Sequence, residues 1–171
     1  MRIVQLTAAD ARPYRAVMLH AYAHAADAFT STPEERAAEP QGWWVKRIAN
    51  PDGLTVAFGA FDGHALQGVV ALEYSAKPKT RHKALVVGMY VMPAARGRGL
   101  ARSLLQAALN QAADRGEITV LQLEVTQGNQ PAFRLYQSFG FETFGTEPMA
   151  LRTPLGYLAK LHMWRRLGDP G

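Results

Sequence analysis

An arginine- and glycine-rich turn between an apolar run and an amphipathic run constrains this chain more than any other feature. The turn lies within "VMPAARGRGLARSLL", residues 91–105. Pro93 ends the preceding strand because proline has no N–H to donate to a sheet ladder. Gly97 and Gly99 permit positive φ angles and leave room for a ligand against the backbone. The pattern predicts a strand, a tight turn and a helix from about residue 97 to 115, with the turn open to a bound group.

The beginning of that helix has the chemistry of an anion site. The first N–H groups of a helix lack intrahelical partners and carry partial positive charge, so they attract phosphate. Arg96 and Arg98 add guanidinium groups that can fork onto phosphate oxygens. The stretch has neither the Gly-Lys-Ser/Thr ending of a P-loop nor the three-glycine spacing of a dinucleotide fingerprint. We predict a pyrophosphate cradle; the alternative is a flexible turn with solvated arginines.

Hydrophobic periodicity along the chain predicts an α+β (mixed α/β) fold with helices on both faces of one sheet. Period-two segments predict strands at residues 2–7, 54–76 (a hairpin), 82–92, 118–126, 142–147 and 156–167. Helical segments are predicted at residues 7–28, 31–39, 42–50, 97–115 and 129–139. The chain contains no internal repeat or linker, so residues 1–171 are expected to form a single domain.

Composition narrows the class of protein. Hydrophobic residues make up 48% of the 171 residues and charged residues 19%, which is ordinary for a globular fold. There is no cysteine, which excludes disulfides, thiolate metal ligands and a cysteine nucleophile, and no metal site is predicted. The N-terminus turns polar by Thr7, and no apolar run approaches the roughly 18 residues of a membrane helix. We expect a cytoplasmic protein without a membrane partner.

The charge balance favours a polyanionic small ligand over nucleic acid. The formal net charge is +5, from 19 Lys+Arg against 14 Asp+Glu. The densest basic stretch, "KPKTRHK" at residues 77–83, is typical of a solvated turn between two strands. The other basic residues are scattered, so no nucleic-acid partner is expected.

Two motifs resemble those of the GNAT-type N-acetyltransferases. The turn fits the family's cofactor motif R/Q-x-x-G-x-G/A, and one strand later the chain fits N-x-x-A-x-x-L-Y-x-x-x-G-F. The matching residues are Arg96, Gly99 and Ala101 in the first motif and Asn129, Ala132, Leu135, Tyr136, Gly140 and Phe141 in the second. "YRAVMLHAYAHAADAF…WW" and "LHMWRRL" also resemble one branch of that superfamily, so the resemblance spans most of the chain. It implies one GNAT-like domain with a mostly antiparallel twisted sheet and a parallel splayed pair.

The resemblance implies an acetyl-CoA site where strand 82–92 splays from strand 118–126. Gly88, within an otherwise apolar run, indicates a bulge or a close backbone approach in the first of these strands. Backbone at residues 89–91 would pair with the pantetheine arm, residues 96–101 would hold the pyrophosphate, and Tyr136 would lie near the sulfur. The implied cofactor-binding residues are Met89, Tyr90, Val91, Arg96, Gly97, Arg98, Gly99, Leu100, Ala101, Asn129, Ala132 and Tyr136. Asn129 would hydrogen-bond the pantetheine, a role compatible with capping the next helix.

Acetyl transfer to an amine sets its own chemical requirements. The amine must be neutral to attack the thioester and form a tetrahedral intermediate, yet at neutral pH only about one lysine-like amine in 10³ is unprotonated. A base, or water leading to one, must therefore take the proton. The oxyanion needs a fixed donor, for which a backbone N–H at the strand bulge around Val91 is the candidate. Tyr136 would donate to the leaving thiolate; its alternative is a packed helix tyrosine.

The catalytic base is not evident. Many relatives carry a glutamate at the position of Val87, and here that carboxylate is absent. Glu124 and Glu73 are the candidates to act through water, and Tyr90, His20 and His24 are weaker ones. The missing carboxylate also motivates an alternative function, a catalytically weak acyl-CoA-binding sensor or interaction module.

The acceptor is predicted only as a primary amine of a small molecule or peptide. The first two helices and the hairpin at 64–82 are expected to form the acceptor wall, and "EPMALRTPLGY" at 147–157 is expected to reach over it as a loop. Adjacent tryptophans on a helix face different ways, so one of Trp43 and Trp44 should be in the core. The chain could be a monomer or a homodimer.

Overall fold

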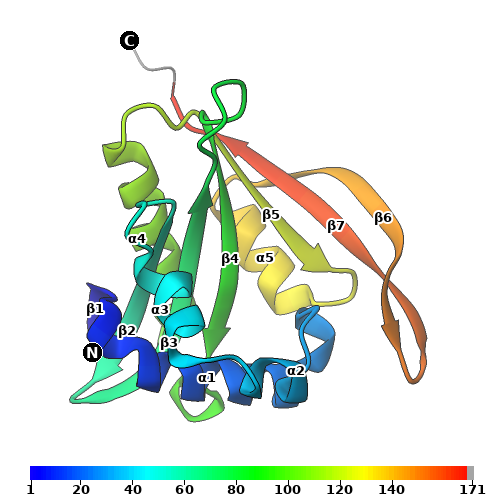
Figure 1. The fold of residues 1–171 in the computed structure, drawn as a ribbon. Helices are drawn as coiled ribbons and strands as arrows, with labels where there is room; N and C mark the ends of the chain where they lie inside the picture. The colour runs from blue at the N-terminus through cyan, green and yellow to red at the C-terminus, as the bar shows by residue number, and fades with distance from the viewer. Residues whose placement is uncertain (169–171) are drawn as a thin grey trace.

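A single mixed sheet organises the protein. The computed structural model describes residues 1–168, and in them a seven-stranded sheet has the order β1-β2-β3-β4-β5-β7-β6 (Figure 1). The last residues of the predicted domain, 169–171, lie outside the described residues. The strands are β1 (Arg2–Gln5), β2 (Thr55–Asp62), β3 (Ala65–Tyr74), β4 (Lys83–Val91), β5 (Val120–Thr126), β6 (Glu142–Thr153) and β7 (Gly156–Arg166). The predicted fold class is confirmed.

The strand pairing is antiparallel throughout the described sheet except between β4 and β5. These two run parallel, and their register consists of three residue pairs, Lys83↔Val120, Ala84↔Leu121 and Leu85↔Gln122. Figure 1 shows β4 and β5 meeting where they begin and diverging toward their C-terminal ends. The predicted parallel splayed pair is therefore present.

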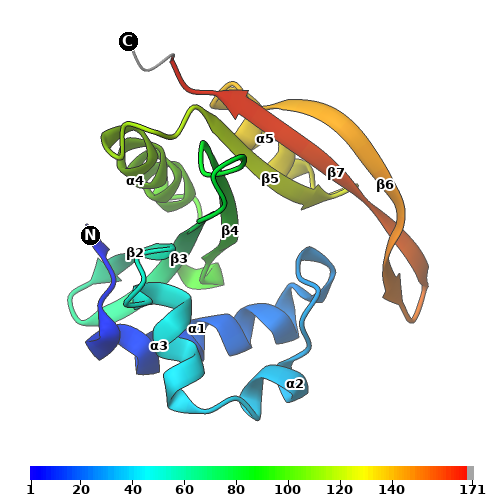
Figure 2. The same ribbon diagram turned by 45° about the horizontal axis from the view of Figure 1, so that its top comes forward.

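Helices cover both faces of the sheet (Figure 2). The helices are α1 (Ala11–His24), α2 (Pro33–Ala37), α3 (Gln41–Ala49), α4 (Leu100–Asp114) and α5 (Gln130–Ser138), and single 3-10 turns lie at Ala8–Asp10, Ala26–Ala28 and Pro93–Ala95. One core cluster packs α4 and α5 against the sheet through residues such as Leu104, Leu105 and Tyr136. The other packs α1 and α3 against the opposite face. Trp44 is fully buried there and Trp43 is half-buried, as the alternation on a helix predicts.

Helix α4 begins three residues later than predicted. Its buried stripe, which includes Leu100, Leu104 and Ala108, follows the predicted helical period. Gly97 and Gly99, however, have φ angles of +74° and +75°, which a right-handed helix cannot contain. The turn therefore belongs to a connecting loop, and Leu100 is the first residue of the helix.

The stretch at 147–157, expected to be a loop, forms the end of the hairpin of β6 and β7, including its turn. Leu151 pairs with Leu158, and Thr153 pairs with Gly156 across the turn. The pairing is interrupted at Pro148 and resumes at Leu151, and the sheet tolerates the proline because β6 is an edge strand. An irregularity between Glu147 and Leu151 absorbs the distortion, and Met149 there has a φ angle of +52°.

Candidate active site

A cavity of about 260 Å³ occupies the gap between β4 and β5. β4 contributes residues 85–89 to its lining and β5 contributes residues 124–126. The remaining lining residues come from three other parts of the chain: Met18, Tyr22, Ala28, Phe29, Thr30, Ser31 and Arg47; Asn129, Ala132 and Tyr136; and Lys160. The resemblance to the N-acetyltransferases placed the cofactor in this gap.

A bulge in β4 borders the cavity. Val87 pairs with Ala71 and Tyr90 with Val69, so β4 has one more residue than β3 between the two pairs. Gly88 lies in this bulge with a φ angle of +63°, which favours glycine. The bulge predicted at Gly88 is confirmed.

The oxyanion donor expected near Val91 needs a correction. The bulge lies at residues 88 and 89, and Met89 lines the cavity, whereas Val91 does not. The Val91 carbonyl accepts a hydrogen bond of 3.1 Å from Arg96 Nε. Gly88 and Met89, the two residues of the bulge, both line the cavity, so their backbone N–H groups replace that of Val91 as candidates for the oxyanion donor.

The predicted cradle lies on the surface beyond the C-terminal end of β4. Residues 96–99 are exposed, and the first hydrogen bond of α4 runs from the Ser103 N–H to the Gly99 carbonyl, at 3.0 Å. The N–H groups of residues 100–102 therefore have no carbonyl partner within the helix. The Leu100 side chain is buried in the core, so that residue can offer a ligand only its backbone.

The two cradle arginines differ in their contacts. Arg98 forms an ion pair of 3.3 Å with Asp62, at the end of β2, and both side chains are about half exposed. The Arg96 guanidinium lies 5.6 Å from the centre of the Tyr90 ring, in addition to its hydrogen bond with the Val91 carbonyl. Arg96 is thus oriented by residues of β4, the strand that precedes it, and Arg98 is oriented by Asp62 at the turn between β2 and β3.

One face of α5 lines the cavity. Asn129, Ala132 and Tyr136 lie three and four residues apart, which places them along one side of the helix. Asn129 is also the N-cap, since its side-chain oxygen accepts a hydrogen bond of 3.4 Å from the Ala132 N–H. This bond explains part of the asparagine's placement without a ligand, and the amide NH₂ group takes no part in it.

Tyr136 is buried against the core and its side chain reaches the cavity. Only 7% of the residue is exposed, its ring makes an edge contact with Phe141, and burial raises the pKa of its hydroxyl to about 12. No hydrogen bond joins that hydroxyl to another residue of the described chain. It is therefore a protonated donor at neutral pH with its hydrogen-bonding capacity unused.

A charged ladder crosses β5, β7 and β6 on the cavity side. Glu124 lines the cavity and accepts a hydrogen bond of 2.9 Å from Lys160 Nζ. His162, opposite Glu124 in the register, lies 3.7 Å from the Glu124 carboxylate and 2.9 Å from Glu147. Glu124 is thus the predicted carboxylate that the fold brings into the gap.

The family assignment follows from comparison with known proteins. A family model described as the acetyltransferase (GNAT) family matches residues 18–141, more than half of the chain. The chain belongs to the GNAT acetyltransferase family. Members of the family use acetyl-CoA as the co-substrate, which is the donor expected from the sequence.

Individual GNAT relatives are similar over different parts of the chain. The mycothiol acetyltransferase of Rhodococcus jostii is 35% identical over 119 residues, which are 63% of this chain and 38% of that protein. The chain thus spans about two fifths of that relative. The crystal structure of ribosomal-protein-alanine N-acetyltransferase from Brucella melitensis is 26% identical, with a TM-score of 0.80 over 98% of this chain and 100% of that one. The acetyltransferase yncA from Salmonella typhimurium, solved with acetyl-CoA, shares the fold at 22% identity and a TM-score of 0.81, over 99% and 95% of the two chains.

The other candidates for the catalytic base do not line the cavity between β4 and β5. Glu73, on the adjoining β3, does not line this cavity but pairs at 3.2 Å with Arg47, which does, so its role through water stays a prediction. The Tyr90 hydroxyl is hydrogen-bonded to His20 Nδ1 at 3.0 Å, and the His20 and His24 rings stack 3.9 Å apart. Burial, together with the nearby His24 and Arg96, lowers the pKa of His20.

The wall predicted for the acceptor is present only in part. The first helix, α1, lines the cavity through Met18 and Tyr22, whereas the hairpin at 64–82 contributes nothing, because its strand β3 pairs with the far edge of β4. Residues 28–31, Arg47 from α3 and Lys160 from β7 complete this lining. Neither basic residue was predicted. The sequence could have indicated Lys160, since it alternates with apolar positions in β7 and must share a face with His162.

Two further observations bear on the predicted absences. No group of three or more His, Asp or Glu side chains within residues 1–168 is placed to hold a metal ion. No helix in that same range is long and apolar enough to span a membrane.

Proposed function

We propose that this protein transfers the acetyl group of acetyl-CoA to a primary amine of a small molecule or peptide, and that residues 1–171 form one domain for this purpose. The observation that carries the proposal is the splayed β4–β5 gap, where a bulged strand, Tyr136 and Glu124 surround one cavity. The exposed glycine turn before α4 lies at the end of the same strand. A thioester in the gap and a pyrophosphate on the turn would fit one extended donor.

The β4 edge beyond Leu85 would receive the pantetheine arm. This edge has no strand partner on the β5 side, so its backbone groups are available for sheet-like hydrogen bonds. A backbone N–H of the bulge, from Gly88 or Met89, would donate to the thioester oxygen as that oxygen becomes an oxyanion. Fixed donors aimed at developing charge are among the strongest contributions to acyl transfer.

Glu124 would accept the proton that the attacking amine loses. The amine nitrogen forms a bond to the thioester carbon, the proton passes to Glu124 through water, and collapse of the tetrahedral intermediate breaks the C–S bond. Tyr136 would donate a hydrogen bond to the departing sulfur. Lys160, 2.9 Å from Glu124, would keep that carboxylate in place at the cavity edge.

The relatives' names point to amines of different sizes. The Brucella melitensis relative is named for the alanine of a ribosomal protein, and the mycothiol acetyltransferase for a small thiol-containing molecule. The proposed acceptor therefore stays at the level of a primary amine, and a panel of amino acids, polyamines and short peptides is the suitable screen.

Calorimetric titration with acetyl-CoA, followed by release of free thiol with the amine panel, tests the proposal. We expect a dissociation constant in the micromolar range, or roughly 8 kcal/mol of binding free energy, and turnover with at least one amine. Binding without turnover across the panel would favour the sensor or interaction module instead. Absence of binding up to millimolar acetyl-CoA would overturn both functions.

Glu124→Gln should lower kcat/KM for the amine by about a hundredfold, the usual scale of a lost general base. Acetyl-CoA affinity should change less than twofold, because the variant keeps the shape of the cavity. Steady-state kinetics with the best amine of the panel measure the effect. Glu147→Gln is the matched control, since Glu147 contacts the same His162 but does not line the cavity. Equal losses in the two variants would contradict the assignment of Glu124 as the base.

A further inference from the structure

The segment that joins α1 to α2, residues 25–31, has cavities on several of its sides. Residues 28–31 border the active-site cavity, and parts of the segment border two more cavities, one toward the end of β5 and one toward β6 near residues 150–154. No residue of the segment is buried. Figure 2 shows the segment rising from the end of α1 on the side of the molecule where β6 and β7 sweep away. Packing around it is thus sparse on several sides.

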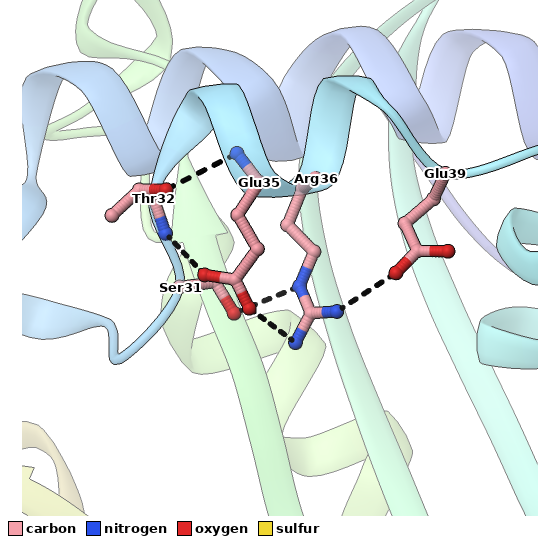
Figure 3. Close-up of polar contacts among 5 residues, drawn as sticks. All are labelled: Ser31, Thr32, Glu35, Arg36 and Glu39. Atoms are coloured by element: carbon pink, nitrogen blue, oxygen red, sulfur yellow. Dashed lines mark hydrogen bonds and ion pairs between the residues drawn. The ribbon is translucent and has the colours of Figure 1, made fainter.

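The two ends of the segment are well anchored. At one end, the Ala25 N–H continues α1 by donating to the Ala21 carbonyl, at 2.8 Å. At the other end, Thr32 and Glu35 form a capping box at the beginning of α2 (Figure 3), with hydrogen bonds of 3.2 and 3.3 Å. Figure 3 also shows Arg36, which donates to Ser31 Oγ at 2.9 Å and pairs with Glu39 at 3.4 Å. Each anchor is local to its own helix.

Between these anchors, one side chain of the sheet holds the segment. Thr126 Oγ1 donates a hydrogen bond of 2.6 Å to the Asp27 carbonyl, across 99 residues of sequence. Within the described chain, this is the hydrogen bond that connects residues 25–31 to the sheet. The segment also packs against the core through Ala25 and Phe29, and the Phe29 ring lies 5.4 Å from Tyr22 and 6.3 Å from Tyr90 between ring centres. Ring packing is less directional than a hydrogen bond, so it fixes the position of the backbone less strictly.

Thr126 lies where such a bond has a functional consequence. It is the last residue of β5 and shares a face of that strand with Glu124, two residues earlier. Both residues line the active-site cavity, and Thr126 is 7% exposed. The strand that carries the proposed base therefore also sets the distance to the opposite wall.

We infer that Thr126 is a positioning residue for the amine acceptor, holding residues 25–31 at the distance from β4 that the acceptor requires. This role rests on the proposed acetyl transfer. The proposed donor contacts come from β4, α5 and the turn before α4, and none comes from residues 25–31, so loss of the bond should affect the acceptor far more than acetyl-CoA.

Thr126→Val tests the inference with a side chain of nearly the same shape. A methyl group cannot donate, and at 2.6 Å it would overlap the Asp27 carbonyl, so the segment must move outward. We expect amide hydrogen exchange in residues 26–31 to accelerate about fivefold to tenfold, as for the loss of one hydrogen bond. The acceptor KM should rise by about the same factor, and the acetyl-CoA dissociation constant should stay within twofold of wild type.

Two companion variants and one control make the test specific. Thr126→Ser keeps the hydroxyl and should restore both exchange and KM, whereas Thr126→Ala removes the donor without the overlap and should behave like Thr126→Val. Thr80→Val is the control, because it removes a hydroxyl that bonds Ser75 in a loop outside the active-site cavity. It should leave exchange at residues 26–31 and the acceptor KM unchanged.

The exchange measurement separates this inference from the proposed function. If wild-type protein acetylates no amine, the proposed function fails and the acceptor role fails with it, but exchange still reports whether Thr126 holds the segment. If wild-type protein turns over and Thr126→Val has a wild-type acceptor KM, the inference is overturned and the proposed function stands. Unchanged exchange in both Thr126→Val and Thr126→Ala would also overturn it.

Discussion

Gly99→Val is expected to weaken acetyl-CoA binding by about 30- to 100-fold. Gly99 has a φ angle of +75°, a conformation that costs a β-branched residue roughly 1–3 kcal/mol. A valine there would shift the turn away from the beginning of α4, and the free N–H groups of residues 100–102 would no longer be presented together. Its side chain would also project into open space, since no atom lies within 4 Å of a Cβ built at this position. Calorimetric titration with acetyl-CoA measures the loss.

Gly116→Val provides the matched control for this prediction. Gly116 follows the other end of α4, has the same φ angle of +75° and also has no atom within 4 Å of a built Cβ. The two variants should therefore lose similar thermal stability, because they introduce similar backbone strain. Only Gly99→Val should lose affinity. Wild-type affinity in Gly99→Val, or equal losses in the two variants, would remove the glycine turn from the cofactor site.

Tyr136→Phe should lower kcat by about 10²- to 10³-fold, within the range of a lost acid–base group, while acetyl-CoA affinity stays within threefold of wild type. Burial raises the pKa of this hydroxyl to about 12. Complete transfer of its proton to a thiolate of reference pKa 8.5 would be uphill by about 5 kcal/mol. Tyr136 is therefore expected to stabilise the developing charge on sulfur by a hydrogen bond rather than to surrender its proton. Thiol release at saturating substrates measures kcat.

The pH dependence gives the same assignment a second readout. Because the pKa is raised, the hydroxyl stays protonated as the pH rises from 7 to 10, and the loss of its proton falls near pH 12. The kcat profiles of Tyr136→Phe and wild type should thus have the same shape over pH 7–10 at different heights. Tyr74→Phe is the control, since Tyr74 is also a buried tyrosine but does not line the cavity. Equal turnover in Tyr136→Phe and wild type would exclude this residue from the chemistry.

Local patterns in the sequence were sufficient for most of the fold and for the bulge beside the cavity. Apolar residues recur with a period of two residues in the strands and 3.6 residues in the helices. Gly88 lies in the β4 bulge, as its position in an apolar run predicts. The predicted beginning of α4 was less accurate. The helix was predicted from residue 97, but the positive φ angles of Gly97 and Gly99 exclude both residues from a right-handed helix. The stretch at 147–157 was likewise predicted as a loop, and it belongs instead to β6, β7 and the turn between them.

The acceptor side could not be predicted because its contacts join distant segments. Lys160 reaches Glu124 across 36 residues, and Thr126 reaches Asp27 across 99. Glu73 looked equivalent to Glu124 in the sequence, since each is a carboxylate in an apolar strand. Only the fold separates the two, because Glu124 lines the cavity whereas Glu73 pairs with Arg47 of α3 and does not line it. Such distinctions depend on tertiary packing, which periodicity does not encode.

Because the register between β4 and β5 is short, the sheet has two parts, β1-β2-β3-β4 and β5-β7-β6, which we call plates and which are joined at one corner. Three residue pairs join the plates at the corner, and the Thr126 bond to the Asp27 carbonyl bridges their open side. A pantetheine arm hydrogen-bonded along β4 would lie in the gap between the two plates. Donor occupancy would then brace the two plates against each other, and the rigidity needed to align an amine with its target would come partly from the substrate itself.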